Sequence, residues 1–190
     1  MSTELQGKKI AFLVANEGVE EVELTEPMKA VREAGAEAEL LAPEAGEVQA
    51  FDHLDKADTF SAEKAVADAD AGDYDGLVLP GGVANPDKLR TEGDAVEFVR
   101  AFFEAGKPVG AICHAPWTLI EAGVVEGRTL TSFPSLQTDL RNAGAEWVDE
   151  EVVTDQGLVT SRKPGDLAAF NSKIVEEFAE GMHEGQKESV

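Results

Sequence analysis

The chain has 190 residues, of which 16 are lysine or arginine and 38 are aspartate or glutamate, so its formal net charge is −22. This length suits one domain with its own core, and a hydrophobic content of 43% is too high for a disordered chain. The negative charge disfavours nucleic-acid binding because it repels phosphate. No apolar run approaches the roughly 20 residues of a membrane helix, so we expect no membrane association.

The excess of acidic residues indicates a halophilic source. So many like charges repel one another in dilute buffer. In molar salt the Debye length falls to about 3 Å, so this repulsion is screened. We therefore expect stability to rise between low and molar salt. An ordinary acidic stress protein is the alternative.

Cysteine usage indicates a reducing, cytoplasmic environment. The single cysteine, Cys113, excludes an intramolecular disulfide and zinc sites built on paired cysteines. The first residues carry neither a basic patch nor an apolar region, so no secretory signal is expected. No metal-ligand spacing joins the three histidines, and we expect neither a metal nor a cofactor.

Apolar runs and helical stripes alternate along the chain. In chain order we predict a strand at 10–14, a helix at 24–34, a strand at 38–42, a small strand or hairpin at 48–53, a polar loop at 55–73 with a short helix near 62–66, a strand at 74–79, a helix at 94–104, a strand at 108–112, a helix at 115–122, a short strand at 130–132, a helix at 136–143, a hairpin of strands 151–154 and 158–161, and a closing helix at 166–178.

This alternation with short connections predicts an α/β fold, in which helices cover both faces of a mainly parallel sheet. We find no internal repeat and no linker, so one domain is expected over residues 1–190. Its core should span about 9–178, and the polar tail at 181–190 should be frayed.

Ligands of open α/β sheets bind at the carboxyl ends of the strands, and Cys113 stands at such an end. A sharp turn between strand and helix would expose its sulfur, as in the nucleophile elbow of hydrolases. The N–H groups of the following helix would favour the thiolate. The alternative is an unreactive core cysteine.

A dense acidic segment, residues 16–23, follows the first strand. Such a segment is usually a solvated face, but one of its glutamates could lean over the cysteine. Burial next to a thiolate would raise the pKa of that carboxyl and suit it to acid–base work. Spacing alone does not say which glutamate this is.

Paired glycines, Gly81 and Gly82, follow another strand and leave N–H groups free for an oxyanion, although a simple tight turn is an equal alternative. His114 directly follows Cys113. Side chains of consecutive residues in a turn usually diverge, so His114 is not automatically its base and could equally be structural. His53 and His183 lie in polar segments and are expected to be exposed.

Several segments in order resemble the ThiJ/PfpI superfamily, and the later ones resemble its PfpI branch in particular. They are Glu20-Glu21-Val22-Glu23-Leu24, Leu79-Pro80-Gly81-Gly82, Ala111-Ile112-Cys113-His114-Ala115-Pro116, Thr131-Ser132-Phe133-Pro134, and the stretches 124–139 and 144–162. The resemblance covers residues 9–178 and implies a flavodoxin-like three-layer sandwich that forms homodimers or homohexamers.

The resemblance also implies roles for individual residues. Cys113 would be the nucleophile, and Glu20 would share a proton with it. Gly82 and the backbone of His114 would donate to an oxyanion. Asp87 of a neighbouring subunit would contact His114, so the site would depend on oligomerisation.

Two residues depart from the family pattern. Ala115 replaces the glycine that usually follows Cys-His, which would narrow the elbow slightly. Phe133 stands where the PfpI branch often has tyrosine, so a phenol hydroxyl near the site is missing.

The resemblance implies a cysteine-dependent stress-response enzyme that acts on a small aldehyde or a glycated substrate. The favoured activity is glutathione-independent conversion of methylglyoxal to lactate, of glyoxalase III or protein deglycase type. The alternatives are an intracellular cysteine peptidase and a non-enzymatic redox sensor or chaperone. A glutamine amidotransferase is rejected because it needs a late His-x-Glu pair, and only His183 comes late.

Overall fold

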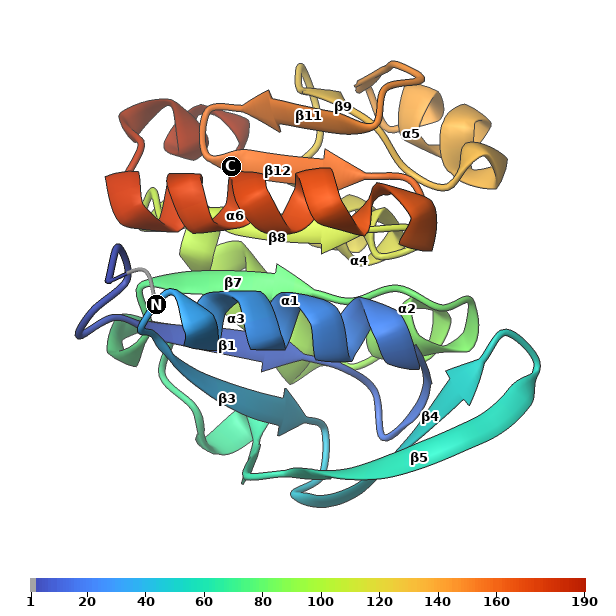
Figure 1. Cartoon of the computed structure of the whole chain (residues 1–190). Coiled ribbons are helices and arrows are strands. Elements are labelled where there is room, and N and C mark those ends of the chain that lie inside the picture. Colours follow the sequence, from blue (N-terminus) through green and yellow to red (C-terminus); the bar gives the residue numbers. More distant parts are fainter. Residues whose placement is uncertain (1–2) are drawn as a thin grey trace.

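The computed structural model describes residues 3–190 and contains a central seven-stranded sheet (Figure 1). Only its edge pair β11–β12 is antiparallel, whereas every other pair of neighbours is parallel. From one edge to the other the strands are β11 (Val152–Asp155), β12 (Leu158–Ser161), β8 (Val109–Ile112), β7 (Gly76–Leu79), β1 (Lys9–Leu13), β3 (Glu37–Ala42) and β6 (Lys64–Ala65).

Helices cover both faces of the sheet, which makes the three-layer α/β sandwich that the sequence predicted. Helices α1 (Glu21–Glu33) and α6 (Leu167–Glu180) lie side by side on one face (Figure 1). Helix α3 (Gly93–Glu104) covers the other face with α2 (Ala84–Leu89) and α4 (Pro116–Glu121). No helix among residues 3–190 is long and apolar enough to cross a membrane.

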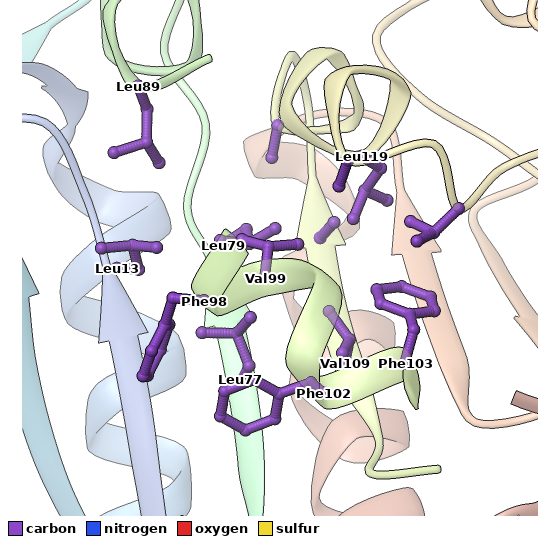
Figure 2. Packing of buried hydrophobic residues seen from close by; sticks show 14 of the residues in the cluster. Leu13, Leu77, Leu79, Leu89, Phe98, Val99, Phe102, Phe103, Val109 and Leu119 are labelled. Atoms are coloured by element: carbon purple, nitrogen blue, oxygen red, sulfur yellow. The ribbon is translucent and has the colours of Figure 1, made fainter. Parts of the chain in front are cut away.

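Each face of the sheet has its own apolar core. The strands β1, β7 and β8 are almost entirely buried because helices cover them on both sides, which explains their unbroken apolar runs. Figure 2 shows the core under α3, where Phe98, Phe102 and Phe103 pack among leucines and valines of the strands. Each fully buried side chain of this size contributes about 1.5–3 kcal/mol to folding.

Two smaller sheets and a short helix lie around the carboxyl ends of the strands (Figure 1). Strands β2 (Glu17–Glu20), β4 (Gly46–Asp52) and β5 (Asp55–Ala62) form a second sheet, from which the β4–β5 hairpin projects beyond the central sheet (Figure 1). Strands β9 (Thr129–Leu130) and β10 (Glu146–Trp147) pair in parallel next to α5 (Gln137–Asn142).

The structure corrects the predicted elements in several places. Strand β6 and a 3-10 helix at Val66–Asp68 stand where a short helix near 62–66 was expected. Residues 55–62 are not a loop but strand β5, which was missed because most of its side chains are exposed and its backbone bonds are made to β4. Helix α2 follows the paired glycines, where only a turn was expected. The tail is not frayed, because a 3-10 helix at Glu184–Ser189 packs on the molecule and buries Gln186.

Candidate active site

Cys113 occupies the sharp turn that the sequence predicted between β8 and α4. Its φ of 64° lies in the left-handed region, which residues other than glycine rarely adopt. Two hydrogen bonds hold this backbone. The Cys113 N–H donates to the Ser161 carbonyl (3.1 Å), and the Cys113 carbonyl accepts from the Phe133 N–H (2.9 Å). Cys113 is 7% exposed, so it is buried at the carboxyl ends of the strands.

The carboxyl group beside the thiol belongs to Glu23 and not to Glu20, which corrects the expected assignment. Glu23 lies on α1 and is fully buried, and it interacts with the Cys113 thiol and with the N–H groups of Gly81 and Gly82. Neither of its carboxyl oxygens meets strict hydrogen-bond geometry with any of residues 3–190. Glu23 is therefore a buried acid that interacts with the thiol.

Helical geometry explains why Glu23 points inward. The buried residues of α1 are Glu23, Leu24, Pro27 and Val31, which recur at intervals of one, three and four residues along one face. Val22, in contrast, is 41% exposed. The apolar stripe of this helix was visible in the sequence, and Glu23 is the acidic residue of the segment that belongs to it.

Glu20 has a different partner, the tip of the β4–β5 hairpin. Its carboxylate accepts a hydrogen bond from the His53 N–H (3.1 Å) and lies 3.2 Å from His53 Nδ1. His53 itself has a φ of 57° and an 80% exposed side chain, as expected for a residue at a hairpin tip. Glu20 thus fastens the hairpin at the edge of the site, whereas Glu23 contacts the thiol.

The paired glycines are required by the close approach of two other groups. A Cβ at Gly81 would lie 2.6 Å from Cys113 Cβ and would collide with the Glu23 carboxylate. Gly82 has a φ of 86°, and its N–H points towards the sulfur, as does that of His114. These are the two N–H groups that were expected to form the oxyanion hole.

Asn85 holds this glycine turn in place and was not predicted as a site residue. Its amide NH₂ donates to the carbonyls of Pro80 (2.9 Å) and Gly81 (3.0 Å), and its oxygen accepts from the Ala15 N–H (2.6 Å). Asn85 is 1% exposed, so these bonds are shielded from water. A polar residue two positions after Gly-Gly-Val was the only signal for it in the sequence.

His114 lies closer to the thiol than consecutive side chains usually do. Its Nδ1 is 3.1 Å from the sulfur of Cys113, and its Nε2 is 3.2 Å from the Ser135 hydroxyl. Its ring stacks on Phe133 with centroids 4.6 Å apart, so the ring without a hydroxyl still orients the imidazole. Burial lowers the pKa of His114, which favours the neutral imidazole.

Asp87 is not brought to His114 within the chain. It lies in the first turn of α2, where it lines a neighbouring cavity of about 580 Å³ together with Trp117. Among residues 3–190 its carboxylate has no hydrogen-bond or ion-pair partner. The expected contact with His114 of another subunit therefore stays a prediction.

The thiol faces a small, mostly apolar cavity of about 210 Å³. The β4–β5 hairpin supplies one wall, and helix α1 and the loops that follow the strands supply the others. The lining residues are Glu20, Glu23, His53, Leu54, Gly82, Val83, Cys113, His114, Phe133 and Pro164.

Burial dominates the electrostatics of the site. Burial, together with the smaller effect of the nearby Glu20, raises the pKa of Glu23 to about 8, although the Cys113 thiol and the glycine N–H groups oppose the rise. Burial and the charge of Glu23 also raise the pKa of Cys113, against the N–H groups of Gly82 and His114. The thiol and the carboxyl group cannot both ionise easily, so they titrate as a coupled pair.

Comparison with known proteins agrees with this architecture. Deglycase PfpI of Pyrococcus furiosus is 43% identical over 169 residues, which are 88% of this chain and 97% of that protein. "Putative cysteine protease YraA" of Bacillus subtilis is 44% identical over 164 residues, which are 86% and 94% of the two chains. The structure of Drosophila melanogaster DJ-1beta superposes with a TM-score of 0.80 at 30% identity, covering 100% of this chain and 96% of that one. The model of the DJ-1/PfpI family matches residues 8–177, and the chain belongs to this family.

Proposed function

We propose that this protein is a cysteine-dependent enzyme that converts reactive carbonyl compounds. The reaction that we assign to it is the conversion of methylglyoxal to lactate without glutathione. The observation that carries the proposal is the pairing of Cys113 with a buried, protonatable Glu23 beneath two backbone N–H groups. The relatives named deglycase support the same class of chemistry.

The groups at the site suffice for each step of this reaction. The sulfur of Cys113 attacks the aldehyde carbon, the carbonyl electrons move to oxygen, and that oxygen takes a proton to give a hemithioacetal. Glu23 then removes the proton from this carbon, which gives an enediol, and returns a proton to the neighbouring carbon, while the hydroxyl proton of the first carbon passes to the oxygen of the second. The product is a lactoyl thioester, which water hydrolyses to lactate and free thiol. No oxidant or cofactor is consumed.

The size of the cavity supports a small substrate. A volume of about 210 Å³ is below the roughly 300–1,000 Å³ of pockets that hold drug-sized ligands. A small dicarbonyl fits such a space, as does the end of a glycated side chain. An extended peptide would need a longer groove.

Lactate formation from methylglyoxal, measured without glutathione, tests the proposal. We expect Cys113→Ala to abolish activity and Glu23→Gln to reduce kcat on the order of 10²–10⁴-fold, the usual contribution of a general acid–base. Glu20→Gln is the matched comparison three residues away, and it should change KM more than kcat because Glu20 holds the hairpin. The assignment fails if Glu20→Gln removes turnover while Glu23→Gln retains it.

A second candidate function is an intracellular cysteine peptidase. The 3.1 Å contact between the sulfur of Cys113 and His114 Nδ1 favours it, because a peptidase needs an imidazole beside its nucleophile. The relative named as a putative cysteine protease points the same way. Peptide turnover that disappears in both Cys113→Ala and His114→Ala would support this candidate.

We further propose that the protein works as a homodimer or homohexamer, in which Asp87 of one subunit approaches His114 of the next. The exposed carboxylate of Asp87 leaves it free for such a contact. Asp87→Asn should then lower activity only in the associated form, which size-exclusion chromatography with activity measurement can resolve. An equal loss in isolated monomers would contradict the subunit contact.

A further inference from the structure

A second group of chemically competent side chains lies at the opposite end of the sheet from Cys113. Glu177 and Glu180 stand in the last turn of α6, and His183 follows the helix. The His183 N–H donates to the Gly106 carbonyl (2.7 Å), and its ring lies against Gly157. Both glycines precede the amino ends of strands β8 and β12, whereas Cys113 follows the carboxyl end of β8.

Two of the three ligand atoms of this cluster, Glu177 Oε2 and His183 Nε2, are buried without a hydrogen-bond partner among residues 3–190. The side chain of Glu177 is only 7% exposed, and its Oε2 lies 3.1 Å from His183 Nε2. The two atoms form an ion-pair contact that lacks hydrogen-bond geometry, so neither has a hydrogen-bond partner among the described residues. An unsatisfied buried polar atom typically destabilises the fold, and such atoms call for an unseen partner.

The spacing of the three ligand atoms fits a metal ion between them. Bonds of zinc to imidazole nitrogen and carboxylate oxygen are about 2.0–2.2 Å, which places two ligands of a tetrahedron about 3.3–3.6 Å apart. Here His183 Nε2 lies 3.1 Å from Glu177 Oε2 and 3.8 Å from Glu180 Oε2. All three ligand atoms lie within 4.8 Å of one another.

We propose that Glu177, Glu180 and His183 bind a divalent transition-metal ion of the zinc type. One imidazole and two carboxylates are ligands that such ions accept. Glu180 is 54% exposed, so the ion reaches its site from solvent and keeps a water molecule as fourth ligand. Two carboxylates and a neutral imidazole together with the ion make a neutral group.

The ion would fasten the C-terminal segment to the domain. Gln186, three residues beyond His183, is fully buried, and it donates to the Lys107 carbonyl and accepts from Arg128. A metal bond at His183 would fix the start of this segment against α6. The inference is therefore a structural site, independent of the reaction at Cys113.

Titration of the metal-free, full-length protein with zinc chloride by calorimetry tests the site, in a Cys113→Ser background that removes the thiol as a competing ligand. We expect one zinc ion per chain. We also expect the melting temperature to rise by about 5–10 °C when the concentration of free zinc is 100 times Kd. Cobalt should give the visible absorption of a tetrahedral N/O site without a sulfur charge-transfer band.

Glu180→Gln is the informative variant because Glu180 is exposed and the fold does not depend on it. This substitution should raise the Kd for zinc at least tenfold. Replacing a residue that only supports a metal ligand already lowers metal affinity by about this factor. His183→Ala should abolish binding. His53→Ala is the matched control, because His53 stands beside two carboxylates, Glu20 and Asp52, in the other such cluster.

Three results would overturn the proposal. They are the absence of zinc binding, binding that Glu180→Gln and His183→Ala leave unchanged, and binding that disappears in His53→Ala. In the first case, the contact between Glu177 and His183 is only an ion pair. Methylglyoxal turnover is not part of these measurements, so their failure leaves the proposed function untouched.

Discussion

Replacement of Glu23 by glutamine should change how the stability of the protein depends on pH. Burial raises the pKa of Glu23 from 4.5 to about 8 in the folded protein. Between these values the native state keeps a proton that the unfolded chain releases, so a rise in pH favours unfolding. The stability that Glu23 contributes is fully present below pH 4.5 and is lost as the pH rises through 8.

The size of this effect follows from the two pKa values. One pKa unit corresponds to about 1.4 kcal/mol, so the wild type should lose about 4–5 kcal/mol relative to Glu23→Gln between pH 4.5 and pH 8.5. This is a large part of the roughly 5–15 kcal/mol by which domains are stable. Glutamine does not titrate, so the variant should lose none of this stability at the alkaline end.

Urea unfolding of both proteins at a series of pH values, in molar salt, measures the difference. Both proteins carry Cys113→Ala, which removes the thiol that titrates together with Glu23. The other acidic residues are common to the two proteins, so their titration cancels in the difference curve. Glu26→Gln changes the same chemical group at an exposed position of α1 and calibrates the method. The free energy of unfolding of the protein that retains Glu23 minus that of Glu23→Gln should fall as the pH rises. If this difference stays flat or increases, the argument from burial is refuted.

Other changes test the remaining inferences. Gly81→Ala places a methyl group against Cys113 and Glu23, so we expect a loss of about 1–3 kcal/mol from overpacking and at least tenfold lower turnover, measured by melting and lactate assay. The melting temperature of the wild type should rise from low to molar salt as its charge of −22 is screened, and an unchanged value would remove the argument for a halophilic source. Mild peroxide should add two oxygens to Cys113, detectable by mass spectrometry, and Cys113→Ala should remain unmodified.

The fold could be predicted largely from the sequence because its strongest signals coincide with its core. Strands buried on both faces give unbroken apolar runs such as 10–14, and helices on the sheet give apolar stripes such as that of α3. Strand β5 escaped detection because its exposed side chains carry no apolar alternation. The C-terminal segment escaped because it is held by a few buried polar contacts, such as those of Gln186.

The candidate site could be predicted by position more readily than by residue. Cys113 and the glycine pair stand at strand ends, which sequence order alone reveals. The choice between Glu20 and Glu23 depends on where α1 begins, because a shift of one turn exchanges the inward-facing glutamate. The distance between the Cys113 sulfur and His114 depends on backbone angles at a strained turn, which sequence pattern does not specify.

The β4–β5 hairpin has a consequence for the evolution of the protein. Cys113, Glu23 and the glycine turn belong to the central sheet and its helices, whereas His53 and Leu54 reach the same cavity from a projecting hairpin (Figure 1). Leu54 is 94% exposed, so little of the core constrains it. Mutations at the hairpin tip can therefore alter which molecules enter the cavity while the reacting groups stay intact, so relatives can diverge in substrate preference and still inherit one catalytic centre.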